Sequence, residues 1–275
     1  MTDFFFWQNE KPLRMVWRVE KNSGAAYLIG TAHFFPHSFA RPLTRLLRAA
    51  PTVLFEGPLD DVSSARIAEY GRQGAGVPTF VDALTPEAIR EIERVLRRRL
   101  ADANGDEWLL TLVERKPIYF ESCTRDVRPW AAFFSIWRAC LAWNYSMDLE
   151  GYQIARRLGK PIQFLETLDE QLAVLDNIPL ERIAHQLNDY TNWETYKHEY
   201  VRTFLAGDLD KLMTLTARFV TRGPVLVGAR DQILFDRMQP ILERERAVAF
   251  VGFPHVPGVT ALFRNAGYAV TQVRA

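Results

Sequence analysis

Short apolar runs bounded by turn residues recur along the chain and predict its strands. Residues 15–20 alternate apolar and polar side chains, and residues 25–29 form a second apolar run after the turn sequence Asn22-Ser23-Gly24. These two runs predict an opening β-hairpin. Four later runs predict further strands, at residues 52–55, 162–165, 247–251 and 268–273.

The residues between these runs carry helix patterns and helix-boundary signals. Thr85-Pro86-Glu87 is a strong helix start, because Thr caps a helix and Pro suits the first helical position, and this helix is expected to reach Arg99. Pro117 begins an aromatic segment that extends to Trp137, and Gly159 stops a helix over residues 147–158. Further helices are expected over residues 42–50, 180–205, 208–219, 230–245 with an interruption at Pro240, and 259–266 after a Pro257-Gly258 turn.

This alternation predicts an α/β core that both ends and the middle of the chain build together. Large helical insertions are expected at about residues 60–145 and 168–245. No linker rich in Ser, Gly and Pro divides the chain, so residues 1–275 are expected to form a single domain.

Two of the apolar runs end in the same motif, Gly-x-x-His. One run leads into Gly30 and His33, and the other leads into Gly252 and His255. With 15 Gly and 5 His in 275 positions, about 0.3 such motifs are expected by chance. Gly permits a sharp exit from a strand, and ligands of open α/β sheets bind at the carboxyl ends of strands. Both histidines are therefore candidate site residues, provided that the two ends of the chain meet.

Two further strands end in a carboxylate. Glu56 follows the strand at residues 52–55 and points into the same crevice as His33 if their strands are parallel neighbours. A surface glutamate at a turn is an equally open interpretation. Glu166 follows the strand at residues 162–165. We interpret His37 as a partly exposed loop residue rather than a ligand.

Two imidazoles with one or two carboxylates form a ligand set that suits Zn, Mn, Co or Fe. A divalent ion acidifies water for attack on a carbonyl, with a second glutamate as general base or as the group that orients the water. A metal-free alternative uses His33 as the base, Glu56 to orient its ring and His255 to stabilise the oxyanion. Both alternatives predict hydrolysis. Arg230 is expected either to bind a substrate carboxylate or, as we favour, to form an ion pair, for instance with Glu166.

Composition narrows the classes of function. The net charge of +1, from 34 Lys and Arg against 33 Asp and Glu, gives no long-range field that attracts nucleic acid. The sequence contains neither a Gly-x-Ser-x-Gly elbow nor a phosphate-binding glycine loop, which argues against a serine hydrolase and a nucleoside-triphosphate enzyme.

The apolar stretches also bear on location. None approaches the roughly 20 residues of a membrane span, and residues 1–7 have neither the basic start nor the apolar length of a signal peptide. Cys123 and Cys140 are isolated, which fits a reducing compartment. We therefore expect a cytoplasmic protein with no membrane or nucleic-acid partner, and the sequence leaves the oligomeric state open.

The order of these pieces resembles the TraB/GumN family, which includes the TIKI-type metalloproteases. The resemblance covers most of the chain. It rests on Trp17-Arg18 before the first Gly-x-x-His, then on Leu54-Phe55-Glu56, Met147-Asp148-Leu149, Gly159-Lys160-Pro161, Phe164-Leu165-Glu166-Thr167, Arg230-Asp231, the stretch 251–258 around His255, and Gly267-Tyr268.

The resemblance implies a fold similar to the erythromycin esterase and ChaN group, an α/β core of mainly parallel β-sheet with large helical insertions. TIKI-type members resemble Mn- or Co-dependent peptidases. By this likeness His33, Glu56 and His255 are expected to be catalytic and to bind a divalent metal, with Mn or Co favoured and Zn also compatible. Glu166 and Arg230 are expected to bind substrate.

Three functions follow as hypotheses. The first is a metal-dependent hydrolase that cleaves peptide or ester/amide bonds in a peptide or a small-molecule substrate. The second is a non-catalytic protein that holds a metal or haem in the same crevice. The third is a structural partner protein that uses the aromatic helices of residues 117–145 as an interface.

Overall fold

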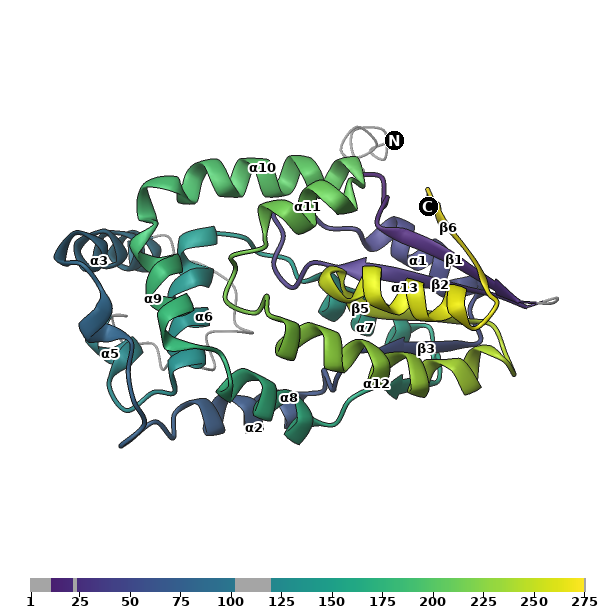
Figure 1. The fold of residues 1–275 in the computed structure, drawn as a ribbon, viewed down its shortest axis with the longest axis horizontal. Coiled ribbons are helices and arrows are strands. Elements are labelled where there is room, and N and C mark those ends of the chain that lie inside the picture. The colour runs from purple at the N-terminus through teal and green to yellow at the C-terminus, as the bar shows by residue number, and fades with distance from the viewer. Residues whose placement is uncertain (1–10, 22–23, 102–119, 275) are drawn as a thin grey trace, which may run out of the picture.

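The computed structural model describes residues 11–21, 24–101 and 120–274 (Figure 1). Three sequence predictions concern residues outside these ranges: the N-terminal residues 1–7, the Asn22-Ser23 part of the first turn, and the start of the aromatic segment at Pro117.

A six-stranded, mostly parallel sheet lies at the centre of the described fold, in the order β4-β3-β5-β2-β1-β6. Neighbouring strands from β4 to β2 pair in parallel, whereas β1 pairs antiparallel with β2 and with β6. The predicted α/β fold, its opening hairpin and its strands are therefore confirmed. The strands are β1 (Val16–Lys21), β2 (Gly24–Thr31), β3 (Thr52–Phe55), β4 (Ile162–Phe164), β5 (Ala247–Gly252) and β6 (Ala269–Val273).

The strand that carries the second Gly-x-x-His lies between β2 and β3. In the parallel register, Thr31 of β2 pairs with Gly252 of β5, and Phe55 of β3 pairs with Phe250 of β5. Every residue of β5 is buried, as expected for a strand with parallel neighbours and covered faces. The strands of His33 and Glu56 are not the direct neighbours that the sequence argument for Glu56 took as its condition, because β5 separates them.

Helices cover both faces of the sheet (Figure 1). On one face α12 (Pro224–Leu242) contacts β2 and β5 and packs against α13 (Val256–Asn265). On the other face α1 (Ala40–Ala49) packs against α7 (Met147–Arg157), which contacts β3. The remaining helices are α2 (Asp61–Gly71), η2 (Val81–Ala83), α3 (Pro86–Ala101), α5 (Phe120–Thr124), α6 (Pro129–Leu141), α8 (Leu168–Asp176), α9 (Leu180–Asn188), η3 (Tyr190–Asn192), α10 (Trp193–Ala206), α11 (Leu209–Leu215) and η4 (Phe253–His255).

Two clusters of buried apolar side chains hold these layers together. The first surrounds the sheet and includes Leu28 and Phe250, together with Phe204 of α10 and Leu234 of α12. The second joins α3, α6, α8 and α9. In Figure 1 the helices of this second cluster lie beyond one end of the sheet, on the left. The expected insertion at residues 168–245 is thus divided between the two clusters, and the single-domain organisation of residues 1–275 stays a prediction.

The prediction of one long helix over residues 180–205 was wrong, since the structure forms α9 and α10 with η3 between them. The break lies at Asp189 and Asn192. The backbone N–H of Asn192 donates to the Asp189 carbonyl at 3.0 Å, and its side-chain amide donates to Asp189 Oδ1 at 2.6 Å. Side chains of Asp and Asn often form such local bonds in competition with a helix.

Proline-based boundaries also differ from expectation. Helix α12 begins at Pro224, which suits a first helical position, and it continues through Pro240 to Leu242 although a proline inside a helix removes one backbone hydrogen bond. Pro257, like Pro224, lies in the first turn of its helix, α13, rather than in a separate turn. Helix α11 ends at Leu215, where the Thr216 hydroxyl donates to the Leu212 carbonyl at 2.8 Å.

Within the described ranges, we find no helix with the length and apolar character that crossing a bilayer requires.

The contact between α7 and β5 leaves no room for a side chain at Gly151. A Cβ there would lie 2.4 Å from the ring of Phe250, which is fully buried and stacks on Phe55 at 4.7 Å. We expect Gly151→Ala to lower the free energy of unfolding by about 1–3 kcal/mol, measured by urea denaturation.

Gly228→Ala is the matched control for this substitution. Gly228 lies within α12 and has open space around it, so Ala is expected to leave stability unchanged or to raise it by up to about 1 kcal/mol. Equal effects of the two substitutions would contradict the close approach of α7 to the sheet.

Candidate active site

Three of the predicted residues meet where β2, β5 and β3 end. Glu56 Oε2 accepts a hydrogen bond of 2.7 Å from the backbone N–H of Gly252, and Glu56 Oε1 lies 3.9 Å from His255 Nε2. A Cβ on Gly252 would lie 3.3 Å from Glu56 Oε2 and 3.7 Å from His33 Nε2. Glu56 Oε2 and His33 Nε2 are therefore separated by no more than about 7 Å, the sum of these two distances. His33, Glu56 and His255 share one centre.

The glycines of both motifs make this convergence sterically feasible. At Gly30 a Cβ would lie 3.0 Å from the Val256 side chain and 3.2 Å from the ring of Trp17, so the chain beside His255 approaches the backbone of β2 closely. After Gly252 the chain turns at once into η4, which ends at His255. The missing side chains therefore let the two strand ends and η4 pack against each other.

A carboxylate orients each histidine ring. His33 Nδ1 lies 2.8 Å from Asp148 Oδ2, and Asp148 Oδ1 accepts a bond of 2.7 Å from the Thr31 hydroxyl. His255 Nδ1 lies 2.6 Å from Asp231 Oδ1. An ionised carboxylate only accepts hydrogen bonds, so Nδ1 of each ring carries the proton. Nε2 of each neutral ring is then left with its lone pair for a ligand or a proton.

Arg230 binds both predicted glutamates. Its Nε donates to Glu166 Oε1 at 2.7 Å and its Nη2 donates to Glu166 Oε2 at 2.5 Å, while Nη2 also donates to Glu56 Oε1. The ion pair between Arg230 and Glu166 that the sequence favoured is therefore present. The Glu166 side chain is only 2% exposed, so this bidentate ion pair is buried, and through Arg230 it fixes the position of Glu56.

The same charges shift the protonation of His33 and Glu56. Desolvation by the surrounding protein disfavours the charged ring, but the charge and hydrogen bond of Asp148, with the charge of Glu56, raise the pKa of His33 to about 9. Desolvation also opposes ionisation of Glu56, but His255, Arg230, His33 and the Gly252 N–H hold its pKa well below the usual range. Water reaches 63% of the His33 side chain and screens part of this field, whereas only 5% of His255 is exposed.

The centre carries an excess of negative charge. With neutral imidazoles, its connected charged groups are four carboxylates and one guanidinium, which gives a formal charge of −3: Glu56, Asp148, Glu166, Asp231 and Arg230. Such a group is stabilised by protonation of the imidazoles or by a bound cation.

The donor set fits a divalent ion in its chemistry. Imidazole nitrogen and carboxylate oxygen are the ligands that Zn, Mn and Co accept, and both rings have the outer carboxylate partner usual for metal-bound histidine. As the side chains lie, no three His, Cys, Asp or Glu groups among the described residues are close enough to enclose an ion. The 3.9 Å between His255 Nε2 and Glu56 Oε1 is too long for a hydrogen bond.

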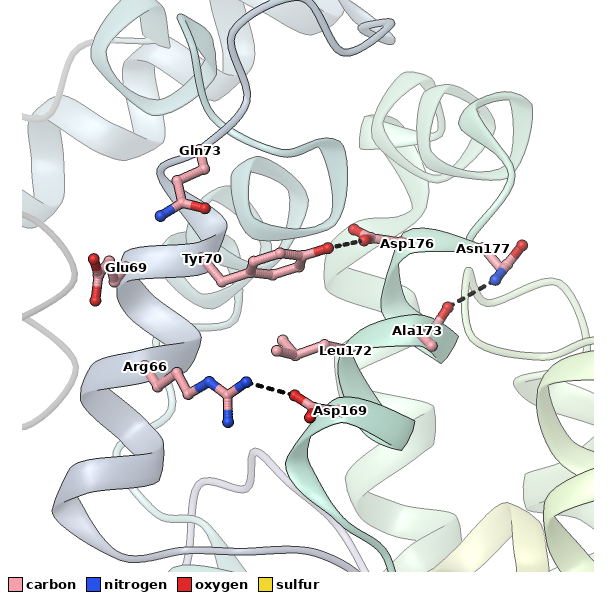
Figure 2. A pocket seen from close by; sticks show the side chains of 9 residues that line it. All are labelled: Arg66, Glu69, Tyr70, Gln73, Asp169, Leu172, Ala173, Asp176 and Asn177. Atoms are coloured by element: carbon pink, nitrogen blue, oxygen red, sulfur yellow. Dashed lines mark hydrogen bonds and ion pairs between the residues drawn. The ribbon is translucent and has the colours of Figure 1, made fainter.

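A separate cleft of about 620 Å³ lies between α2 and α8 (Figure 2). None of the five predicted site residues lines it. Arg66 pairs with Asp169 across the cleft, and Asp176 accepts bonds from the Tyr70 hydroxyl at 2.5 Å, from Arg128 at 2.9 Å and from Trp130 at 2.9 Å. Asp176 therefore joins α2, α6 and α8, which is a structural role.

Sequence reasoning missed the two aspartates that orient the histidines. Asp148 lies in the first turn of α7, where acids are common because the helix dipole favours them, so its position in the sequence does not reveal its contact with His33. The signal for Asp231 lies at Gly258, where a Cβ would come within 1.9 Å of Asp231 Oδ2. His37, which the sequence indicated as a loop residue, is half-buried with its ring edge against Phe35.

Comparisons with known proteins give one finding. The sequence model of the TraB/PrgY/gumN family matches residues 15–272, nearly the whole chain. No curated protein and no solved structure matches the sequence.

The contact between His33 and Asp148 predicts a pH-dependent stability in protein freed of metal with a chelator. The pKa of His33 is about 9 in the folded chain against 6.5 for a free side chain, so its stabilising effect is complete below about pH 6.5 and is lost as the pH rises through 9. An NMR titration of the imidazole signals is expected to show one midpoint near 9.

Asp148→Asn is expected to move this midpoint down toward 6.5, since it removes the charge that favours the protonated ring. His198→Gln is the control: it removes the signal of an exposed histidine outside the centre and is expected to leave the His33 midpoint unchanged. A His33 midpoint near 6.5 in the unmodified chain would contradict the interaction.

Proposed function

This chain belongs to the TraB/PrgY/gumN family, and from that membership together with the geometry of the centre we propose that it is a metal-dependent hydrolase. Its substrates carry a peptide bond or another ester or amide bond. His33, Glu56 and His255 hold a divalent ion, for which Mn and Co are the first candidates.

One observation carries the proposal, the pairing of each histidine with its own aspartate. Asp148 and Asp231 bind Nδ1 of their rings at 2.8 and 2.6 Å, with His255 Nε2 3.9 Å from Glu56 Oε1 and His33 Nε2 no more than about 7 Å from Glu56 Oε2. Buried carboxylates that bind the outer nitrogen of a histidine fix its tautomer and raise the basicity of the inner nitrogen. Two such pairs around one glutamate support a cation site more directly than either histidine motif does alone.

A divalent ion at this centre would supply Lewis acidity, which acidifies water and polarises a carbonyl oxygen. The protein's own groups hold the side chains of the centre in a fixed orientation. The Gly252 N–H and the Arg230 guanidinium hold one carboxylate oxygen of Glu56 each, so this carboxylate cannot rotate freely. Because His33 is exposed while Glu56 and His255 are buried, substrate approaches from the His33 side.

A metal-free mechanism with His33 as the base receives less support. A ring whose pKa is about 9 is protonated at neutral pH and cannot accept a proton from water. The carboxylate that orients this ring is Asp148 and not Glu56, as that mechanism assumed. A divalent cation can replace the proton on Nε2 and satisfies the same negative field.

Glu166 is poorly suited to act as the general base. Both of its oxygens accept hydrogen bonds from Arg230, and the pair supports Glu56 from below. We therefore propose that Arg230 and Glu166 position Glu56. Their contact with substrate, which the resemblance implied, stays a prediction.

The test combines metal analysis with turnover. Chelator-treated protein is loaded with Mn²⁺ or Co²⁺, the bound metal is counted, and the hydrolysis of a panel of peptides, esters and amides is measured. We expect one tightly bound ion per chain and metal-dependent hydrolysis. His255→Ala is expected to lose the tightly bound ion and to reduce the hydrolytic activity by roughly 100-fold or more.

Asp231→Asn is expected to weaken metal affinity by roughly 10–100-fold, because the His255 ring that binds the metal stays in place and loses only the carboxylate that orients it. His185→Ala is the matched control, since His185 is an exposed histidine on α9 outside the centre. Tight 1:1 metal binding without turnover would favour the non-catalytic alternative, and the absence of any bound metal would refute the proposal.

A further inference from the structure

Arg222 places a positive charge beside the centre described above. The residue lies in the segment that joins α11 to α12, which in Figure 1 runs between the helices on the left and the sheet on the right. Its guanidinium carbon lies 4.6 Å from the centroid of the Phe253 ring. Phe253 directly follows Gly252, whose N–H binds Glu56. The aromatic ring in contact with Arg222 and the backbone N–H that holds Glu56 therefore belong to consecutive residues.

The charge of Arg222 has no acidic partner within the described part of the chain. The one hydrogen bond of its side chain in this part of the chain is long, from Nε to the Thr216 hydroxyl at 3.4 Å. Arg230, by contrast, binds two glutamates. Burial lowers the pKa of Arg222 to about 10, even though Tyr200, Tyr196 and Glu56 raise it, so the group stays charged at neutral pH. A half-buried cation without a counter-ion is costly, and an anionic ligand would offset that cost.

A second guanidinium lies close to Arg222. Arg182 Nη1 is 3.4 Å from the position of a Cβ on Gly223, the residue after Arg222, and its Nη2 donates to the Ala217 carbonyl at 3.0 Å. The described residues show no ion pair for Arg182 either. Two neighbouring cations without acids raise the local positive potential, which favours an anion over a neutral ligand.

Two tyrosine hydroxyls complete the set of donors. Tyr196 and Tyr200 lie one turn apart on α10, with ring centroids 5.9 Å apart, and the Tyr200 ring lies 6.0 Å from that of Phe253. Burial raises the pKa of both phenols, so each hydroxyl keeps its proton. The described residues show no hydrogen bond for either hydroxyl. Neither oxygen is among the fully buried side-chain atoms that lack a partner, which are Arg14 Nε and Thr203 Oγ1, so each oxygen is within reach of a ligand. Both hydroxyls are therefore open to a ligand.

We propose that Arg222, with the hydroxyls of Tyr196 and Tyr200, binds a carboxylate of the substrate next to the bond that is cleaved. This inference rests on the proposed hydrolase function and names its substrate class: N-acyl amino acids and short peptides with a free terminal carboxylate. The planar guanidinium matches a carboxylate in shape, and the aromatic rings of Phe253 and Tyr200 provide an apolar wall for the rest of the substrate. A singly charged carboxylate suits this place better than a phosphate, because Glu56 and Asp148 are close.

The test separates binding from turnover. N-benzoylglycine and its amide, N-benzoylglycinamide, differ only in the carboxylate, and their affinities for chelator-treated protein are measured by calorimetry. We expect the acid to bind roughly tenfold more tightly than the amide, or better. Arg222→Met is expected to abolish this difference, and Arg218→Met, which removes an exposed charge four residues away, is expected to preserve it.

The metal-loaded protein gives the second readout. For a short peptide with a free carboxylate, Arg222→Met is expected to raise KM by roughly tenfold with little change in kcat, while the amidated peptide is unaffected. Equal affinity of the original protein for acid and amide would overturn the proposal. An equal loss of kcat on both peptides would also overturn it, since Arg222 would then act at the reacting bond.

A folding defect in Arg222→Met would not decide the question. Tyr200→Phe keeps the ring and removes only the hydroxyl. It is expected to lower the affinity for N-benzoylglycine by roughly threefold or more without changing the affinity for the amide. If the acid is preferred and no panel substrate is cleaved, the anion site stands and the hydrolase function fails. If substrates are cleaved without this preference, the reverse holds.

Discussion

The parallel pairing of β2 with β5 is the constraint on which the rest of the site depends. It sets Thr31 opposite Gly252, so that two Gly-x-x-His motifs from opposite ends of the chain leave the sheet side by side. Strand β3 pairs with the other edge of β5 and brings Glu56 to the same end, where its carboxylate binds the Gly252 N–H. Because helices cover both faces of β5, a shift of one residue would turn each of its side chains to the opposite layer and would separate these groups.

Around this frame the chain concentrates carboxylates, whose charges either protons or a bound cation can offset. Asp148 and Asp231 each bind a histidine, and Glu56 and Glu166 share Arg230. Burying so many acids with one guanidinium is unfavourable unless protons or a metal ion neutralise them. The guanidinium of Arg222 lies 4.6 Å from the centroid of the Phe253 ring, and the described residues show no acidic ion-pair partner for it. In the function that we propose, the acidic centre holds the cation and Arg222 holds the anion, which is the arrangement that a hydrolase of carboxylate-bearing substrates needs.

Local patterns were sufficient to predict the strands, the opening hairpin and the residues at the strand ends, because burial and turn chemistry act over a few positions. Strand order was not predictable in this way: the position of β5 between β2 and β3 depends on long-range pairing. The aspartates were missed for the same reason. Asp231 is recognisable only beside Gly258, which α12 and α13 bring together. Arg230 was correctly expected to pair with Glu166, yet its bond to Glu56 emerged only from the fold.

The most direct test of the central claim is the X-ray absorption fine structure of the Co²⁺-loaded protein, which reports the atoms that surround the ion. The account predicts scattering from two imidazole rings together with lighter oxygen ligands, and the loss of one ring in His255→Ala. A spectrum without imidazole scattering, or one that His255→Ala leaves unchanged, would contradict the claim that the two ends of the chain hold one ion between them.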